Sequence, residues 1–92
     1  MSKKRSRLEI IKDILVVIKE RDGKIKPTHI LYKSNLSHQM MEEYLGELIE
    51  KEFIKVHKKV RNSKTYSITD KGLKYIAKHR EIMEFTERFG LN

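Results

Sequence analysis

Apolar residues at the start of the chain recur at the spacing of an α-helix. Between residues 8 and 18 they fall every three or four positions and cover about half of a helix circumference at roughly 100° per residue. Ser6 followed by Glu9 is a capping-box pattern that opens a helix, and Asp22-Gly23 supplies a turn that ends one. The pattern therefore predicts a first helix between these two signals, followed by a short strand at residues 24–26.

Two further helices are predicted between residues 27 and 51. Pro27 suits the first turn of a short helix. The polar segment at residues 33–37 interrupts the helical pattern, and Ser37 is a typical cap for the helix that follows. The apolar stripe of that helix consists of Met40, Met41, Tyr44, Leu45, Leu48 and Ile49. The sequence thus predicts a helix, a tight polar turn and a second helix.

From residue 53 onward the apolar period changes from helical to alternating. Apolar and polar residues alternate up to a polar turn at residues 61–64, and they alternate again after it. The alternating apolar positions are Ile54, Val56, Val60, Tyr66 and Ile68. This pattern is typical of a two-stranded antiparallel hairpin.

The last predicted helix begins after a Thr69 cap, runs over about residues 70 to 88 and carries two apolar stripes. One stripe holds Leu73, Ile76, Ala77 and Met83, and the other holds Tyr75, Ile82, Phe85 and Phe89. Because large apolar groups gathered on a surface usually mark an interface, the second stripe predicts contact with a second copy of the chain. Alternatively, the stripe packs back onto the first helix, whose wide apolar face also needs cover. The predicted dimer interface consists of Tyr75, Ile82, Phe85, Phe89, Ile10 and Val17.

The order of the predicted elements is helix, short strand, helix, turn, helix, hairpin, helix. Two helices joined by a tight turn and followed by a basic hairpin are the parts of a winged helix-turn-helix, in which the second helix of the pair enters the DNA major groove. We therefore expect an α+β fold, mostly α, with a C-terminal helix used for dimerisation. The expected division is a flexible basic arm at residues 1–7, a winged-helix domain at residues 8–69 and a dimerisation helix at residues 70–92.

Several short motifs resemble those of a known family. They are Ile25-Lys26-Pro27-Thr28-His29-Ile30, Tyr32-Lys33-Ser34-Asn35-Leu36-Ser37, Tyr44-Leu45 with Leu48, and Tyr66-Ser67-Ile68-Thr69 with Lys71-Gly72. Between about residues 8 and 77 the chain resembles small archaeal winged-helix DNA-binding regulators and chromatin proteins. In members of that family a long last helix pairs two subunits as an antiparallel coiled coil. The resemblance therefore implies a homodimer that binds DNA.

The charge of the chain indicates a polyanionic partner. Its 92 residues include 21 Lys and Arg against 13 Asp and Glu, which gives a formal net charge of +8 and a pI of about 9.8. The predicted hairpin holds several cations and no acid from residue 53 to residue 67. Such a cluster binds phosphates by releasing condensed counterions, although lysines on an exposed sheet edge also protect against aggregation. With the helix pair upstream, we favour contact with DNA.

The first turn of the third helix carries polar side chains suited to nucleic acid. Backbone N–H groups there can bind phosphate, and Gln39 or His38 could reach a base edge. Four glutamates on the solvent side of this helix oppose phosphate, so we expect either entry by the N-terminal turn alone or acceptance by Glu43 from the amino group of cytosine. The predicted DNA-binding residues are Lys33, Ser34, Asn35, Ser37, His38, Gln39, Lys58, Lys59, Arg61 and Lys64.

The sequence carries no signature of an enzyme or a metal protein. It has no Cys, its 4 His residues lie on separate predicted elements, and phosphate-loop, dinucleotide-binding, zinc-protease and serine-hydrolase motifs are absent. We expect no catalytic site, metal, cofactor or small-molecule ligand. The tyrosines are expected in the core with their hydroxyls at the surface. The longest apolar run, residues 14–18, is too short to cross a bilayer, which favours a cytoplasmic, nucleoid-associated protein.

The sequence as a whole favours a homodimer that binds double-stranded DNA, as a transcriptional regulator or as a chromatin-associated protein. The acidic face of the third helix keeps a second hypothesis open, a protein-protein interaction module of the transcription machinery. RNA binding is a third hypothesis, because charge alone does not distinguish duplex RNA from duplex DNA.

Overall fold

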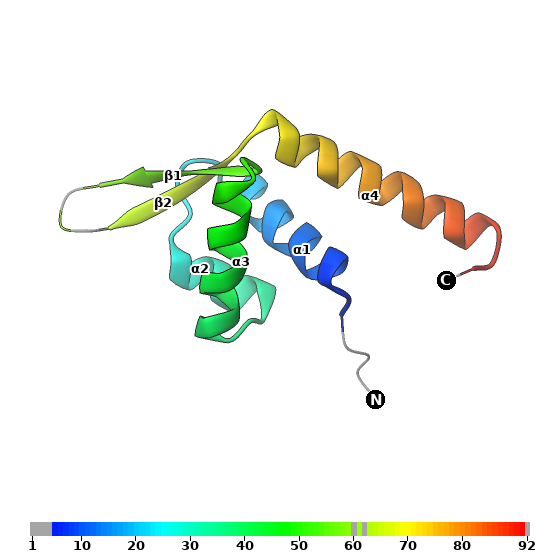
Figure 1. Cartoon of the computed structure of the whole chain (residues 1–92), viewed down its shortest axis with the longest axis horizontal. Helices are drawn as coiled ribbons and strands as arrows, with labels where there is room; N and C mark the ends of the chain where they lie inside the picture. Colours follow the sequence, from blue (N-terminus) through cyan, green and yellow to red (C-terminus); the bar gives the residue numbers. More distant parts are fainter. Residues whose placement is uncertain (1–4, 60, 62, 92) are drawn as a thin grey trace.

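The computed structural model describes residues 5–59, 61 and 63–91. In these residues the chain forms four helices and one two-stranded hairpin (Figure 1). The elements are α1 (Arg7–Glu20), α2 (Pro27–Ser34), α3 (His38–Glu50), β1 (Ile54–Lys58), β2 (Lys64–Ile68) and α4 (Asp70–Arg88). Their order confirms the predicted α+β fold, mostly α.

Three side-chain caps set the starts of the long helices. The Ser6 Oγ accepts from the N–H of Glu9 at the start of α1, the Ser37 Oγ accepts from the N–H of Met40 at the start of α3, and Thr69 caps α4 in the same way. A hydroxyl oxygen at this position satisfies one of the backbone donors that an α-helix leaves without a partner. These helices therefore begin where the sequence predicts.

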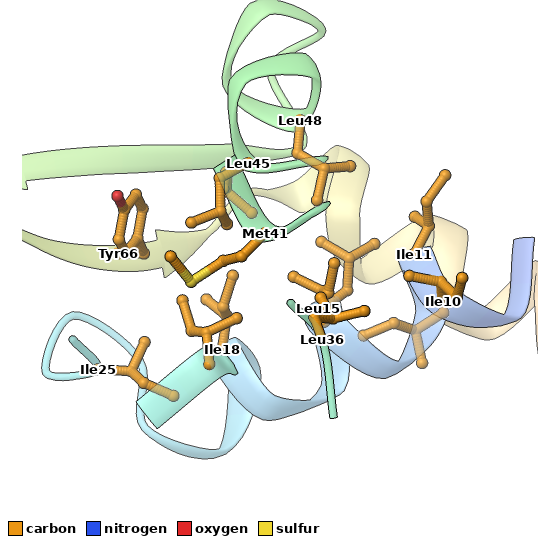
Figure 2. Close-up of a cluster of buried hydrophobic side chains, with 14 residues drawn as sticks. Ile10, Ile11, Leu15, Ile18, Ile25, Leu36, Met41, Leu45, Leu48 and Tyr66 are labelled. Carbon is orange, nitrogen blue, oxygen red and sulfur yellow. The ribbon is translucent and has the colours of Figure 1, made fainter. Parts of the chain in front are cut away.

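The core lies where α1 packs against α2, α4 and the base of the hairpin (Figure 2). Five residues of α1 are buried in it: Ile10, Ile11, Ile14, Leu15 and Ile18. The inner stripe of α3 adds Met41, Leu45 and Leu48. The prediction that Ile10 belongs to a dimer interface is wrong, because this side chain is already buried within the protomer.

The predicted short strand at residues 24–26 is reduced to a single bridge. Ile25 pairs with Tyr66, whose N–H donates to the Ile25 carbonyl at 3.2 Å. On the N-terminal side of Ile25, the N–H of Gly23 donates to the Tyr66 carbonyl at 3.0 Å and Asp22 Oδ1 accepts from the N–H of Ile68 at 2.9 Å. The segment between α1 and α2 therefore lies along the outer edge of β2 and fixes the base of the hairpin to the core.

The distal half of α4 leaves the body of the protein. Near the start of the helix Ile76 is buried, and the half-buried Tyr75 donates its hydroxyl to the Leu8 carbonyl at 2.9 Å. Further along, Ile82, Phe85 and Phe89 are between 57% and 61% exposed. Figure 1 shows this half of α4 extending beyond the other elements. In the first half of α4 only one side of the helix is covered, since Leu73 is 39% exposed while Ile76 is buried, and in the distal half no large apolar side chain is buried, which differs from the two predicted stripes.

A tight junction joins the end of α3, the start of β1 and the start of α4. Glu52 has a left-handed φ of 64°, and the hydroxyl of Thr69 lies within hydrogen-bond distance of the carbonyl oxygens of Glu52 (2.7 Å) and Phe53 (2.9 Å). Gly72 packs so closely here that an added Cβ would lie 2.5 Å from the Phe53 carbonyl oxygen. The junction therefore fixes the direction of α4 relative to α3 and the hairpin.

Candidate nucleic-acid interface

The turn between α2 and α3 is short and well determined by its residues. Asn35 ends α2 in the left-handed conformation, with φ 54°, and Asn is one of the residues that tolerates it. Leu36 is buried and anchors the turn to the core, and Ser37 then caps α3. Two helices packed across such a turn have the geometry of a helix-turn-helix.

Ser34 does not belong to the surface that was predicted to contact DNA. Its side chain is 1% exposed, and its carbonyl accepts from Arg5 Nη2 at 2.6 Å. A hydroxyl buried in this way is not available to a duplex, so the prediction for Ser34 is wrong. The reason is tertiary: the last turn of α2 is covered by its packing against α1 and α3.

The basic arm predicted at residues 1–7 is fixed in its second half. Arg5 donates to Asp13 Oδ2 at 2.7 Å as well as to Ser34, and Arg7 is the first residue of α1. Burial raises the pKa of Asp13, but hydrogen bonds from Lys12 and Arg5 outweigh it and hold that pKa below its ordinary value. Residues 1–4 of the predicted arm lie outside the described residues. Arg5 therefore contributes to the fold of the helix pair.

The first turn of α3 presents Ser37, His38 and Gln39 at the surface. Each of the last two faces a glutamate one turn further on: His38 Nε2 lies 3.7 Å from Glu42 Oε1, and Gln39 Nε2 donates to Glu43 Oε1 at 3.3 Å. The candidate base-contacting side chains and the acids that were expected to repel DNA thus form paired groups on one exposed face.

Glu47 points away from this face toward α1. It accepts from Arg7 and from Lys51, the latter at 3.0 Å. These hydrogen bonds lower the pKa of Glu47 from 4.5 to about 2. Two cations therefore balance the charge of this acid within the protein, which leaves fewer unbalanced acids on α3 than the sequence indicates.

The hairpin carries its cations on exposed positions. Among the residues that the structure describes, no acid forms an ion pair with any of Lys55, Lys58, Lys59, Arg61 and Lys64. Lys58 and Lys64 are directly opposite each other in the register of the two strands. Like charges in such a pair destabilise a hairpin, so a ligand that brings negative charge would relieve them. A hollow of about 500 Å³ at the same end is lined by Lys58, Lys59, Ser63 and Lys64.

The base of the hairpin lies beside the C-terminal end of α3. The chain passes from α3 to β1 through a three-residue turn, and α3 packs directly against β1 as well as against α2. Figure 1 shows the hairpin extending from α3 toward one end of the molecule and the C-terminal end of α4 at the other, with α3 between them. The described hairpin cations and the first turn of α3 are both exposed.

The exposed surface of α2 extends beyond Lys33, the residue of this helix that remains a predicted DNA contact. Tyr32 was expected in the core but is 78% exposed, beside the exposed Lys33. Lys26 and His29 are exposed on the same short helix. The sequence does indicate a basic surface in this region, because no acid occurs from residue 23 to residue 41. An acid-free stretch thus precedes α3, and another follows it in the hairpin.

The described part of the chain holds no group of three or more His, Cys, Asp or Glu side chains placed to bind a metal ion. None of its helices has the length and hydropathy needed to span a membrane.

The helix pair, the hairpin beside it and the short bridge at Ile25 together define a winged helix-turn-helix domain. The chain belongs to the winged helix-turn-helix family, whose model matches residues 4–87. This confirms the family that the sequence motifs resemble.

Two similar sequences come from the archaeon Methanocaldococcus jannaschii, the uncharacterized proteins MJ0290 and MJ0287. MJ0290 is 32% identical over 81 residues, which are 88% of this chain and 35% of that protein. MJ0287 is 35% identical over 81 residues, 88% of this chain and 76% of that protein. The chain thus spans about a third of the first relative and about three quarters of the second.

Solved structures show the same fold. Sso10a-2, a DNA-binding protein from Sulfolobus solfataricus, superposes with a TM-score of 0.80 at 24% identity, over 92% of this chain and 85% of that one. MepR, a transcription regulator of the Staphylococcus aureus multidrug efflux pump MepA, superposes with a TM-score of 0.73 at 17% identity, over 87% of this chain and 60% of that one. At these identities the likeness is one of fold.

Proposed function

We propose that this protein binds double-stranded DNA through its hairpin and the first turn of α3, as a transcriptional regulator or a chromatin-associated protein. The observation that carries the proposal is the set of exposed, unpaired cations on a hairpin that lies directly beside α3. Two structures of similar fold support it: Sso10a-2 is described as DNA-binding, and MepR has been solved in complex with DNA. Binding to chromosomal DNA would place the protein in the nucleoid.

The physical basis of the proposed affinity is phosphate neutralisation. Each hairpin cation that meets a phosphate releases condensed counterions, so binding weakens as the salt concentration rises. The exposed N-terminal turn of α3 offers backbone N–H groups and polar side chains, which suit phosphate contact and base contact respectively. The proposed DNA-binding residues are Lys33, Asn35, Ser37, His38, Gln39, Lys58, Lys59, Arg61 and Lys64, all of them exposed.

The test is a fluorescence titration of a mixed-sequence duplex at several salt concentrations. The variant is Lys58→Ala with Lys59→Ala, and the matched control is Lys19→Ala with Lys74→Ala, which removes the same charge from exposed positions on α1 and α4. We expect the hairpin variant to reduce the slope of log affinity against log salt by about 1.8, about 0.9 for each lost phosphate contact. Equal losses in the two double variants would contradict the proposal.

The same titration separates the alternative functions. A duplex RNA of the same sequence tests for RNA binding, because its groove geometry differs from that of DNA. A protein-interaction module should ignore both duplexes at moderate salt. We expect tighter binding to DNA than to RNA.

We also propose that two copies of the chain pair through the distal half of α4. Ile82, Phe85 and Phe89 are exposed there, and the rings of Phe85 and Phe89 pack with their centroids 4.7 Å apart. In a twofold dimer, this apolar patch on each copy would be covered by the same patch on the other copy. Tyr75 and Val17, also predicted at the interface, are half-buried against the protomer's own core. Sedimentation equilibrium is expected to give the mass of a dimer.

A further inference from the structure

Two arginines lie on either side of the residue that caps α1. Ser6 is the N-cap, Arg5 precedes it, and Arg7 is the first residue of the helix. Both arginines belong to the segment that was predicted to form a flexible basic arm. Their guanidinium groups instead donate hydrogen bonds to other parts of the protein. These two cations therefore have a use within the fold.

The Arg5 guanidinium covers the carbonyl end of α2. Its Nη2 donates to the carbonyl oxygens of Ser34 at 2.6 Å and Asn35 at 3.2 Å, and its Nη1 donates to Asp13 Oδ2 at 2.7 Å. The last carbonyls of a helix have no partner inside it, and the helix dipole favours a cation there. The side chains of Arg5 and Asp13 are only 30% and 27% exposed, so water and salt screen this pair incompletely. Arg5 thus fixes the turn between α2 and α3 to α1.

Arg7 contacts the other end of α3. Its guanidinium donates to Glu47 in the last turn of that helix and lies 5.7 Å from the centre of the Tyr44 ring, one turn earlier. The turn that Arg5 contacts lies directly before the first residue of the same helix. Two arginines that are two positions apart in the sequence therefore hold α3 at both of its ends.

We propose that Arg5 is a positioning residue for DNA binding, which holds the first turn of α3 in the orientation that meets a duplex. The inference rests on the proposed function and gives Arg5 a role other than phosphate contact. Asn35, whose carbonyl accepts from Arg5, is the left-handed residue of the turn, with φ 54°. Leu36 and Ser37 alone separate it from α3. A change in the backbone of Asn35 would therefore redirect the side chains of His38 and Gln39.

The salt dependence of binding distinguishes positioning from phosphate contact. An arginine that neutralises a phosphate contributes about 0.9 to the slope of log affinity against log salt. A positioning residue changes the affinity but leaves the slope unchanged, because the number of phosphate contacts stays the same. The three acceptors that Arg5 already has within the protein favour the second role.

The experiment compares Arg5→Gln and Arg5→Lys with the wild type in the same duplex titration. We expect Arg5→Gln to weaken binding about tenfold at an unchanged slope, which is the cost of misplacing one good base contact. Arg5→Lys should recover part of the affinity, because an ammonium group keeps the charge and can donate to a carbonyl of the turn. The control is Lys19→Gln, which removes one charge from an exposed position on α1 and should change the affinity by less than about twofold.

A second measurement is made on the protein without DNA. In Arg5→Gln the amide NMR signals of residues 36–39 should shift, while those of the hairpin should stay in place. A slope reduced by about 0.9 would overturn the inference, because Arg5 would then contact phosphate. So would a lower Tm with wild-type affinity, because the role of Arg5 would then be limited to stability.

The proposed function is tested separately by the hairpin variant. If Lys58→Ala with Lys59→Ala weakens binding and Arg5→Gln does not, the proposed function stands and the role of Arg5 is refuted. A wild-type protein that binds no duplex refutes both. Should Arg5→Gln fail to fold, Arg5→Lys decides alone: a weaker affinity at the wild-type slope supports positioning, and wild-type affinity together with unshifted signals at residues 36–39 opposes it.

Discussion

The two ends of this molecule expose opposite chemistry. The hairpin end presents cations without acidic partners among the described residues, whereas the distal half of α4 presents phenylalanine and isoleucine side chains. The protein measures 50 Å along its longest axis, and the two surfaces lie at the two ends of it (Figure 1). A charged surface needs a partner of opposite charge, while an apolar surface is satisfied by another copy of itself. The proposed DNA binding and the proposed self-association therefore fall on separate surfaces that can be altered one at a time.

The largest effect is expected from the apolar end. Phe85→Ser with Phe89→Ser should convert the proposed dimer into a monomer and weaken binding to a long duplex by about 10²-fold, because two linked sites bind far more tightly than one. Analytical ultracentrifugation and duplex titration measure the two effects. Glu84→Ser with Arg88→Ser, exposed on the same half of α4, is the control. A monomer that kept full duplex affinity would show that the two ends act independently.

An intermediate effect is expected at the hairpin. Lys64→Glu places a carboxylate opposite Lys58, so a repulsive cross-strand pair becomes attractive. The unfolding free energy should rise by about 0.2–1 kcal/mol, while duplex affinity should fall about tenfold. Lys55→Glu, which faces Ser67 across the strands, should lower affinity without that gain in stability. Urea denaturation and duplex titration distinguish them, and a loss of stability in Lys64→Glu would argue against repulsion at this pair.

The smallest effect, on thermal stability, is expected at Glu47, which already accepts hydrogen bonds from Arg7 and Lys51. The folded-state pKa of Glu47, about 2, lies below its ordinary value of 4.5 because Arg7 and Lys51 donate to it. These bonds stabilise the fold above pH 4.5, and their contribution disappears as the pH falls toward 2. The Tm of the wild type should exceed that of Glu47→Gln slightly at pH 7, and the two should converge near pH 2. A difference that persisted at low pH would rule out ionisation as its source.

The sequence predicted best what depends on neighbouring residues. Ser6, Ser37 and Thr69 cap their helices because a hydroxyl and a backbone N–H three residues later are brought together by local geometry alone. The change from helical to alternating period likewise predicted the hairpin, although β1 ends at Lys58 and β2 already begins at Lys64, inside the predicted turn; Val60 lies outside the described residues. The element order then followed, and with it the fold.

The sequence predicted less well what depends on distant segments. Ser34 is polar and sits in a turn motif, yet packing around the end of α2 buries it. Ile10 lies in the core because α1 is covered on several sides. Tyr32 is exposed because it lies on the side of α2 away from the buried Ile30 and Ser34. The pairing of Glu47 with Arg7 joins residues that are far apart in the sequence. Local pattern carries no information about such contacts.

The rigid start of α4 has a consequence for the DNA sites that a dimer could occupy. Thr69 and Gly72 hold α4 to the turn after α3, and the helix then continues without interruption to Arg88. Removing one residue from its distal half would rotate the paired protomers by about 100° and shift them by about 1.5 Å. Equivalent groove positions recur on a duplex only every 10–10.5 base pairs or so. The length of α4 would thus determine which spacings between two half-sites a dimer can bind.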